Sequence, residues 1–317
     1  MTPWQARLRP QSVEDKLAIH EILTKNLKLG LIEPCQGAYA CDVILVRKAS
    51  GRHAIANNLK DLNKQSTRNC YPVPLLSDSM ACLAGANYLS SVDLCGAYTS
   101  IELDERCRDY FGFITHSGLY RWRVLPYGYK GSSGIFCMVI DGSLAGLKWQ
   151  VLVSYVDDVC CYGGSSFTAH LRVLNTTCNR LQRDGHRISV AKCHLFEKVL
   201  CYLGFDITKE GSMPSQQNVR KMLNTPLKSV GDLRSFLGLA GFYRRFIKGY
   251  AQLTSPVQKL IICKTRAEKK TLWLLAYDAI IKLRDALSTY PIMPHPDFLK
   301  KFYLCTDSSK EGFGGNI

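Results

Sequence analysis

The sequence predicts an α+β fold through the centre of the chain, with packed helices after residue 214. Strand-like, helix-like and hairpin-like segments interleave there without the strand–helix–strand rhythm of a parallel sheet. Residues 229–247 place apolar side chains, such as Leu233, Phe236 and Ala240, at helical spacing. Hydrophobic residues make up 46% of the 317 residues, which is enough for a sizeable core and excludes a largely disordered chain. At roughly 150 residues per domain, this length indicates two domains.

The individual elements are expected in chain order. A first helix is expected over 13–29, where apolar Leu17, Ile22 and Leu27 alternate with charged residues. The next elements are a strand over 43–46, a non-helical connector over 71–74, a strand over 88–94, a hairpin over 109–125 turning at 116–118, a helix over 132–146, strands over 151–156 and 159–162, a helix over 166–184 and a strand over 199–205. Ser229 and Asp232 resemble a capping box at the start of the helix over 229–247.

The charge of the chain indicates an anionic partner. The formal net charge is +15 and the sequence pI is about 9.2, so nucleic acid, a membrane surface or an acidic protein are the candidate partners. Residues 214–270 hold twelve Lys or Arg and two acidic residues. A solvated helix face is the ordinary explanation for such a run, but this concentration favours a phosphate-binding surface.

The location of the protein is expected to be intracellular and not secreted. No run of 18 apolar residues is present, which predicts no membrane-spanning helix, and the first residues lack the apolar core of a signal peptide. The fourteen cysteines are scattered and include no Cys-x-x-Cys pair. We therefore expect reduced, mostly buried thiols in preference to a disulfide framework or a zinc site.

Three aspartates are the candidates for chemistry. Asp157 and Asp158 interrupt the apolar, strand-forming run over 151–162, and Asp93 ends another strand-like run. Adjacent carboxylates in such surroundings repel each other, and a divalent cation removes that cost. An ordinary polar turn remains the alternative for Asp157 and Asp158 alone. With Asp93 added, three carboxylates at strand ends suit two Mg²⁺ ions about 3.5–4 Å apart, as in phosphoryl transfer, with Mn²⁺ as a substitute.

Seven segments in order along the chain carry a resemblance to a known family. They are Leu31-Ile32-Glu33-Pro34, Tyr71-Pro72-Val73-Pro74, Val92-Asp93-Leu94-Cys95-Gly96-Ala97-Tyr98, Leu125-Pro126-Tyr127-Gly128-Tyr129-Lys130-Gly131-Ser132, Tyr155-Val156-Asp157-Asp158, Tyr202-Leu203-Gly204-Phe205, and the run from Phe236 to Ile247 that contains Tyr243-Arg244-Arg245-Phe246. In this order the chain resembles the reverse transcriptases of Ty3/gypsy-like LTR retrotransposons and, a little less closely, those of retroviruses.

The resemblance implies a right-hand polymerase fold, with the parts assigned as follows: fingers at 1–68 and 101–131, palm at 69–100 and 132–213, thumb at 214–262, and a connecting segment with the start of a ribonuclease H domain at 263–317. It implies an RNA-directed DNA polymerase that joins a dNTP to a primer 3′-hydroxyl by the two-metal reaction. The implied partners are an RNA or DNA template with its primer, dNTPs, and a second copy or other parts of a Pol polyprotein. The implied location is the cytoplasm, virus-like particles or the nucleus.

The resemblance also implies roles for individual residues. Asp93, Asp157 and Asp158 would hold the metals, and Lys192 would protonate the pyrophosphate. Tyr98 would be the steric gate that rejects a ribose 2′-hydroxyl. The other implied nucleotide-binding residues are Arg47, Lys48, Arg52, Leu94 through its carbonyl, Tyr127 and Gly128. The implied nucleic-acid-binding residues are Lys130, Tyr155, Tyr202, Leu203, Gly204, Arg244 and Arg245.

Several positions depart from the family pattern and leave an alternative open. Ala54, Asn58 and Lys60 stand where the family has Arg, Asp and Arg, and Ser133-Gly134 replaces a pair made of Ala and Pro. Residues 304–309 resemble the first ribonuclease H strand, with Asp307 as its first catalytic aspartate, but a single aspartate cannot form that site, so no ribonuclease H activity is expected. The alternative to an active polymerase is a remnant that binds nucleic acid without polymerising.

Overall fold

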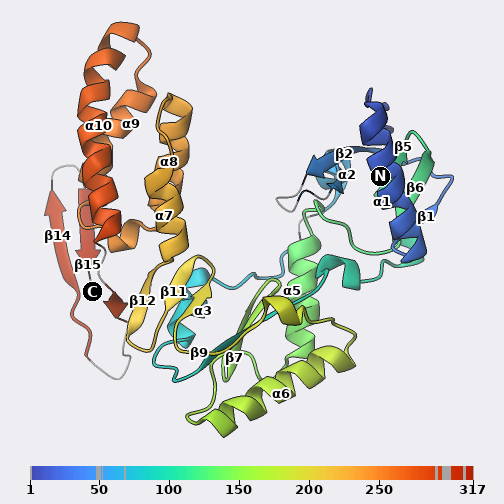
Figure 1. The fold of residues 1–317 in the computed structure, drawn as a ribbon, viewed down its shortest axis with the longest axis horizontal. Helices are drawn as coiled ribbons and strands as arrows, with labels where there is room; N and C mark the ends of the chain where they lie inside the picture. The colour runs from blue at the N-terminus through green and yellow to red at the C-terminus, as the bar shows by residue number, and fades with distance from the viewer. Residues whose placement is uncertain are drawn as a thin grey trace. The chain divides into compact units, whose positions relative to one another are not determined.

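The computed structural model describes residues 2–47, 51, 53–67, 69–289, 292–294, 301–309 and 312–316, and it confirms the α+β class. The chain divides into two compact units (Figure 1). The first comprises residues 1–79 and 87–197, and the second comprises residues 80–86 and 198–317. Two of the predicted site residues, Lys48 and Arg52, lie outside the described residues, as do Tyr290 and Pro291.

One sheet of the first unit has the order β1-β6-β5-β2-β3, formed by β1 (Ile32–Pro34), β6 (Gly118–Trp122), β5 (Gly112–Thr115), β2 (Cys41–Arg47) and β3 (His53–Asn57). The hairpin β5–β6 confirms the turn predicted at 116–118. Helix α1 (Val13–Lys28) starts at a capping box in which Ser12 and Asp15 bond each other's backbone amides. Ile19 and Leu23 of α1 pack with strand residues and with Leu62 of α2 (Lys60–Gln65) in one buried cluster.

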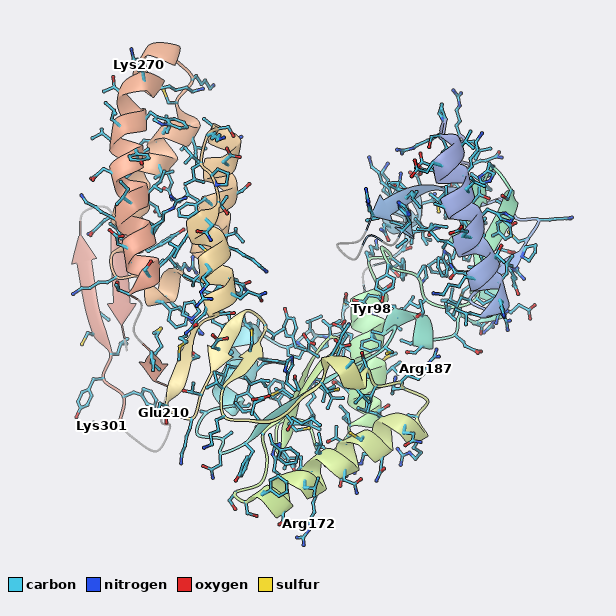
Figure 2. The ribbon with its side chains drawn as sticks, in the orientation of Figure 1. Tyr98, Arg172, Arg187, Glu210, Lys270 and Lys301 are labelled. Atoms are coloured by element: carbon cyan, nitrogen blue, oxygen red, sulfur yellow. The ribbon has the colours of Figure 1, made fainter. Side chains whose placement is uncertain are left out.

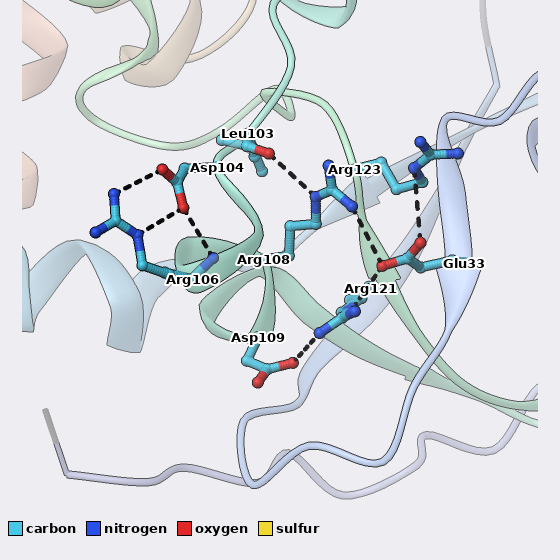
Figure 3. A network of polar contacts seen from close by, with 8 residues as sticks. All are labelled: Glu33, Leu103, Asp104, Arg106, Arg108, Asp109, Arg121 and Arg123. Carbon is cyan, nitrogen blue, oxygen red and sulfur yellow. Dashed lines mark hydrogen bonds and ion pairs between the residues drawn. The ribbon is translucent and has the colours of Figure 1, made fainter.

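A network of arginines joins the edge of this sheet to the short elements α4 (Glu105–Arg108) and η2 (Asp109–Phe111) (Figure 3). Glu33 of β1 pairs with Arg121 at 2.7 Å and lies within 4 Å of Arg108 and Arg123. Arg121 also reaches Asp109 at 2.6 Å. One carboxylate thus faces three guanidinium groups, which explains why Glu33 tolerates its partly buried position.

The second sheet of the first unit has the order β7-β8-β4-β9, formed by β7 (Leu152–Tyr155), β8 (Asp158–Cys161), β4 (Leu89–Asp93) and β9 (His194–Glu197). Helices α5 (Ser132–Ser143) and α6 (Phe167–Arg183) pack on it through a core that includes Phe136, Leu152 and Leu174. After Asp158, the residues of β8 are Val159, Cys160 and Cys161, and all three are fully buried. Burial on both faces of the strand explains why the sequence is continuously apolar there. The remaining elements here are η1 (Tyr98–Ser100) and η3 (Val190–Lys192), and α3 (Leu76–Cys82) begins in this unit and ends in the second.

The connector over 71–74 is non-helical, as predicted, and a partly buried acid holds it. The hydroxyl of Tyr71 donates to Asp141 of α5 at 2.8 Å, and this hydrogen bond raises the pKa of Tyr71 to about 12. Lys148 and Ser154 also donate to Asp141, at 2.5 and 3.3 Å. A connector, a helix and strand β7 therefore meet at one carboxylate, which fixes the base of the sheet that carries the aspartates.

The second unit combines a small sheet with helices (Figure 1). The sheet has the order β10-β11-β12-β13, formed by β10 (Leu200–Tyr202), β11 (Phe205–Ile207), β12 (Gly211–Pro214) and β13 (Met293–Pro294). The helical elements are α7 (Gln216–Asn224), α8 (Val230–Phe242), η4 (Arg244–Phe246), α9 (Tyr250–Ile262) and α10 (Arg266–Ser288). The strand expected over 304–309 is β14 (Cys305–Ser309), paired with β15 (Gly312–Asn316). The ribonuclease H role of Asp307 stays a prediction, because the side chain of Asp307 is not among those that the structure describes.

Two predicted elements were wrong in extent. The single strand expected over 199–205 is a hairpin, because Leu203 and Gly204 have φ angles of 50° and 85° and reverse the chain between β10 and β11. The helix expected over 229–247 begins at the predicted capping box but ends at Phe242, and a 3-10 turn follows over 244–246. Pairs of positive φ angles such as those at 203 and 204 belong to tight hairpin turns, and the apolar pattern of the segment does not reveal them.

The state of the cysteines and the length of the helices can be compared with what the sequence predicted. All fourteen cysteines lie within the described residues, and each is a free thiol. The expectation that most are buried was wrong, because only Cys41, Cys137, Cys160 and Cys161 are buried. Burial raises the pKa of Cys160 well above its usual value. Among the described residues, every helix is too short or too polar to cross a lipid bilayer.

Candidate active site

The three aspartates come together where β4 meets the β7–β8 hairpin. Asp93, the last residue of β4, is the direct cross-strand partner of Asp158, the first residue of β8. Asp158 in turn pairs with Tyr155, so Val156 and Asp157 form a two-residue loop. The sequence predicted both adjacent aspartates at the turn. That was wrong for Asp158, which lies inside the strand because its pairing with β4 and β7 continues to the end of the hairpin.

The φ angles of the loop match those of a type II′ turn. Val156 has a φ of 55°, whereas Asp157 keeps a negative φ. A positive φ is unfavourable for a β-branched residue, at a cost of about 1–3 kcal/mol. The turn leaves Asp157 exposed and Asp158 half-buried. Backbone strain is therefore present at the residue that sets the direction of Asp157.

The site has an excess of negative charge that one lysine partly offsets. Burial, together with the charges of Asp157 and Asp93, raises the pKa of Asp158, and the ammonium of Lys192 opposes this rise. Lys192 Nζ lies 3.1 Å from Asp93 Oδ2, and this contact raises the pKa of Lys192. Carboxylates raise one another's pKa because their negative charges repel, and an added cation relieves this repulsion.

The carboxylates fit magnesium without forming a complete metal site of their own. Within the described ranges, no cluster of three or more His, Cys, Asp or Glu side chains has the arrangement of a metal-binding group. Magnesium usually takes only one or two protein carboxylates and completes its shell with water and substrate phosphates. Asp93, Asp157 and Asp158 would offer such an ion hard oxygen ligands and unbalanced negative charge.

Backbone pairing fixes the segment that carries Lys192. Cys95 N donates to Arg187 O at 2.7 Å, and Ser189 N donates to Asp93 O at 2.9 Å. These bonds flank Leu94, whose side chain is buried, and they hold η3 against the end of β4. Figure 2 labels Arg187 at this end of the sheet. Neither bond uses the carbonyl of Leu94, so this backbone pairing does not block the nucleotide-binding role predicted for that carbonyl.

A buried histidine joins strands β4 and β9 to helix α6. His170 of α6 is fully buried, with Nε2 2.8 Å from Ser90 Oγ and Nδ1 2.7 Å from the carbonyl of Gly163. Ser90 Oγ also accepts from the amide of Phe196 at 3.0 Å. Strands β4 and β9 are thereby joined to α6 three residues before Asp93, so the sheet edge that carries the site is rigidly supported.

Tyr98 lies beside the first turn of α5 (Figure 2). Its ring makes edge contacts with Tyr127 and Phe136, with centroid separations of 5.0 and 5.7 Å. Its hydroxyl is 3.0 Å from Ser133 Oγ. Burial and the charge of Asp157 raise the pKa of Tyr127, which places Tyr127 within the electrostatic reach of the aspartates. Two of the residues predicted to contact the nucleotide, Tyr98 and Tyr127, are therefore in direct ring contact.

Asn63 of α2 holds the segment that contains Gly128 and Lys130. Its amide nitrogen donates to Gly128 O, and its amide oxygen accepts from Lys130 N, both at 2.8 Å. Gly128 has a φ of 93°, which favours glycine. The ammonium of Lys130 donates to the carbonyl of Ser66. Lys130, predicted to contact a nucleic-acid strand, thus has an internal partner in this structure.

The remaining predicted residues fall into two groups. Arg47 ends β2 opposite His53, in the first unit. In the second unit, Tyr202 is buried and precedes the turn formed by Leu203 and Gly204. The carbonyl of Gly204 accepts from the hydroxyl of Tyr243 at 2.9 Å, and that hydroxyl accepts from Asn218 at 3.1 Å.

The two adjacent arginines of η4 have different surroundings. The guanidinium of Arg245 lies over the rings of Phe205 and Phe246, at 4.9 and 4.7 Å, and 3.2 Å from Met80 Sδ. Desolvation lowers the pKa of Arg245. Both arginines are exposed by residue area, and what distinguishes Arg245 is that its guanidinium lies against these two rings. Arg245 therefore has a packing role that the sequence did not reveal.

Sequence reasoning missed two residues with roles at the site. Asn63 received no role from the sequence, and Ser133 stands out there only as a departure from the family pattern. Their partners are 65 and 35 residues away in the chain, so no local periodicity marks them. The only available signal was that both are polar residues within or beside otherwise recognisable motifs.

Comparison with known proteins agrees with this geometry. The family model described as reverse transcriptase (RNA-dependent DNA polymerase) matches residues 47–207, a range that spans half of the chain and contains all three aspartates. The chain belongs to the reverse transcriptase family. The resemblance identified from the ordered motifs is thereby confirmed.

The relatives come from transposons. The chain is 26% identical over 319 residues to the retrovirus-related Pol polyprotein from transposon 297 of Drosophila melanogaster, covering 99% of this chain and 30% of that polyprotein. It is 28% identical over 299 residues to the transposon Tf2-3 polyprotein of Schizosaccharomyces pombe, covering 94% of this chain and 22% of that polyprotein. The chain therefore spans less than a third of the length of these relatives.

Solved structures share the fold. The foamy viral protease-reverse transcriptase in complex with double-stranded DNA has a TM-score of 0.86 at 19% identity, covering 100% of this chain and 58% of that chain. The same kind of protein in complex with an RNA/DNA hybrid has a TM-score of 0.82 at 20% identity, covering 93% and 40%. These similarities confirm the right-hand polymerase fold class.

Proposed function

We propose that this chain is the polymerase part of a retrotransposon reverse transcriptase, which joins a dNTP to a primer 3′-hydroxyl along an RNA or DNA template. The observation that carries the proposal is the direct cross-strand pairing of Asp93 with Asp158, next to Asp157 in a tight loop. No ordinary polar turn requires a third aspartate opposite the hairpin. Three convergent carboxylates beside one lysine instead suit phosphoryl transfer.

Each group then has a part in the reaction. Asp93, Asp157 and Asp158 would hold two magnesium ions, which activate the attacking hydroxyl and neutralise the leaving pyrophosphate when bound. Lys192 would release Asp93 and carry a proton to the pyrophosphate. The ring of Tyr98 would occupy the space that a ribose 2′-hydroxyl needs. Arg47, with Lys48 and Arg52, would contact the triphosphate.

The nucleic-acid partner is inferred from charge and from related structures. The two foamy viral complexes hold an RNA/DNA hybrid and double-stranded DNA. The basic segment over 214–270 offers the phosphate contacts that such a duplex requires. We propose that the fingers are formed by residues 1–68 and 101–131 and the palm by residues 69–100 and 132–213. The thumb would then be formed by residues 214–262. Assembly as a dimer or with other Pol segments remains part of this proposal.

The experiment is extension of a DNA primer on an RNA template with magnesium. The parent is compared with a variant carrying Asp157→Asn and Asp158→Asn, and with Asp278→Asn as a control that removes one exposed carboxylate on α10. The proposal expects extension by the parent and the control and none by the double variant. A soluble parent that binds the duplex but fails to extend it, even with manganese and high dNTP, would instead establish a non-polymerising remnant.

A further inference from the structure

Ser133 is placed to act on the residue proposed as the steric gate. It is the second residue of α5, and its Oγ lies 3.0 Å from the hydroxyl of Tyr98. A serine in the first turn of a helix can bond its own backbone, but here the hydroxyl is directed to a side chain 35 positions away. The Ala and Pro side chains that the family pattern has over 133–134 carry no hydroxyl, so this contact depends on the departure at Ser133.

The contact supplies the restraint that the neighbouring rings do not. Tyr127 and Phe136 meet the ring of Tyr98 at interplanar angles of 68° and 89°. Edge contacts of this kind are comparable in energy to a hydrogen bond, but they fix no single atom of the ring. The hydroxyl of Tyr98, at the far end of the ring, is the atom whose displacement is largest when the side chain moves. A hydrogen bond at that atom therefore restricts the ring more than either edge contact.

The next residue, Gly134, anchors the same helix end on its other side. A Cβ atom at Gly134 would lie 3.0 Å from Asn69 Cγ, so glycine allows Asn69 to pack directly against α5. Asn69 Oδ1 in turn accepts a hydrogen bond from the backbone amide of Tyr71 at 2.8 Å. Asn69, Lys130, Ser133 and Gly134 line one open groove of about 760 Å³. Ser133 thus stands between this groove and Tyr98, on a helix end whose position is fixed.

We propose that Ser133 is a positioning residue that fixes the ring of Tyr98 and thereby sets how strictly the site rejects ribonucleotides. The proposal rests on the proposed polymerase function. A ring that is held in one position excludes a 2′-hydroxyl by steric overlap, whereas a ring that can shift accommodates it. Loss of the bond should therefore affect ribonucleotides more than deoxynucleotides.

The test measures kcat/KM for incorporation of one dNTP and of the matching rNTP on the same primer–template. The variants are Ser133→Ala, Ser133→Thr, Tyr98→Phe and the Ser133→Ala, Tyr98→Phe double variant. Ser133→Ala and Tyr98→Phe should each lower the dNTP/rNTP ratio by about fivefold, the factor that corresponds to one neutral hydrogen bond. The double variant should lower it no further, and Ser133→Thr, which keeps a hydroxyl, should retain most of the parental ratio.

The outcomes separate this inference from the proposed function. Extension by the parent with a ratio that Ser133→Ala leaves unchanged would overturn the positioning role alone. Multiplicative losses in the double variant would overturn it as well, because the two hydroxyls would then act independently. A parent that extends no primer would overturn the proposed function and this inference with it. Thermal unfolding of each variant identifies any loss of activity that comes from misfolding.

Discussion

Lys192 forms an ion pair with Asp93, with Nζ 3.1 Å from Oδ2, across 99 positions of sequence. The pair joins η3 to the end of β4 and neutralises one of the three carboxylates. Any cation that binds Asp93 must compete with this ammonium, because both use the same oxygens. The lysine is therefore expected to oppose metal binding in the free protein and to become available when metal and nucleotide bind.

Replacing Lys192 by Met tests this competition. The variant should bind Mg²⁺ more tightly than the parent in the absence of nucleotide, because a positive charge beside Asp93 is removed. Its primer extension should slow by about 10²-fold or more, the usual effect of losing a general acid. Titration of thermal stability with Mg²⁺ and single-nucleotide extension measure the two effects. Lys282→Met, on the exposed face of α10, is the matched control, and weaker Mg²⁺ binding by Lys192→Met would contradict the prediction.

Replacing Val156 by Gly tests the strain in the loop. The substitution relieves a positive φ at a β-branched residue, worth about 1–3 kcal/mol, and costs about 1 kcal/mol of chain entropy. The free energy of unfolding should stay equal or rise. Val199→Gly is the control, since Val199 is an exposed valine without a positive φ, and its replacement should destabilise the protein. Urea denaturation measures both, and equal destabilisation by the two substitutions would show that Val156 is unstrained.

His186 gives a stability that depends on pH. Its Nε2 lies 3.2 Å from Ser143 Oγ, and burial lowers the pKa of His186, with Asp184 opposing. The unfolded chain therefore binds more protons than the folded one once the pH falls below about 6.5. The free energy of unfolding should decrease as the pH is lowered through and below that value.

The His186 contribution is isolated by comparing slopes of stability against pH. His186→Gln should have a shallower fall in stability between neutral and mildly acid pH than the parent. His20→Gln, on the exposed face of α1, should keep the parental slope. Denaturant titrations at several pH values measure these slopes. A parental slope in His186→Gln would mean that other groups account for the acid sensitivity.

Replacing Arg244 should weaken duplex binding, whereas replacing Arg245 should lower the stability of the protein. Arg245→Ala removes a guanidinium packed on Phe205 and Phe246 and should lower the free energy of unfolding by about 1–3 kcal/mol. Arg244→Ala should leave stability unchanged and weaken duplex binding, with the salt dependence reduced by about one phosphate contact. Thermal unfolding and salt-dependent affinity measure the pair. Identical behaviour of the two variants would contradict the distinction.

The strands of the site and the three aspartates could be predicted from the sequence because their signals are local, whereas β3 and β9 were not predicted. Apolar runs define β4, β7 and β8, and an aspartate at the end of such a run is conspicuous. The hairpin at Leu203 was not predicted because a leucine carries no mark of a positive φ. The bonds of Asn63 and Ser133 could not be predicted either, because they join distant segments and depend on how the elements pack.

The hydroxyl of Tyr243 joins the β10–β11 turn to α7, through Gly204 and Asn218. One oxygen thus makes the turn and the end of α8 a single mechanical part within their unit. A displacement of α8 would therefore move the turn with it. Loss of that one oxygen, by Tyr243→Phe, would leave the turn and the helix free to move separately.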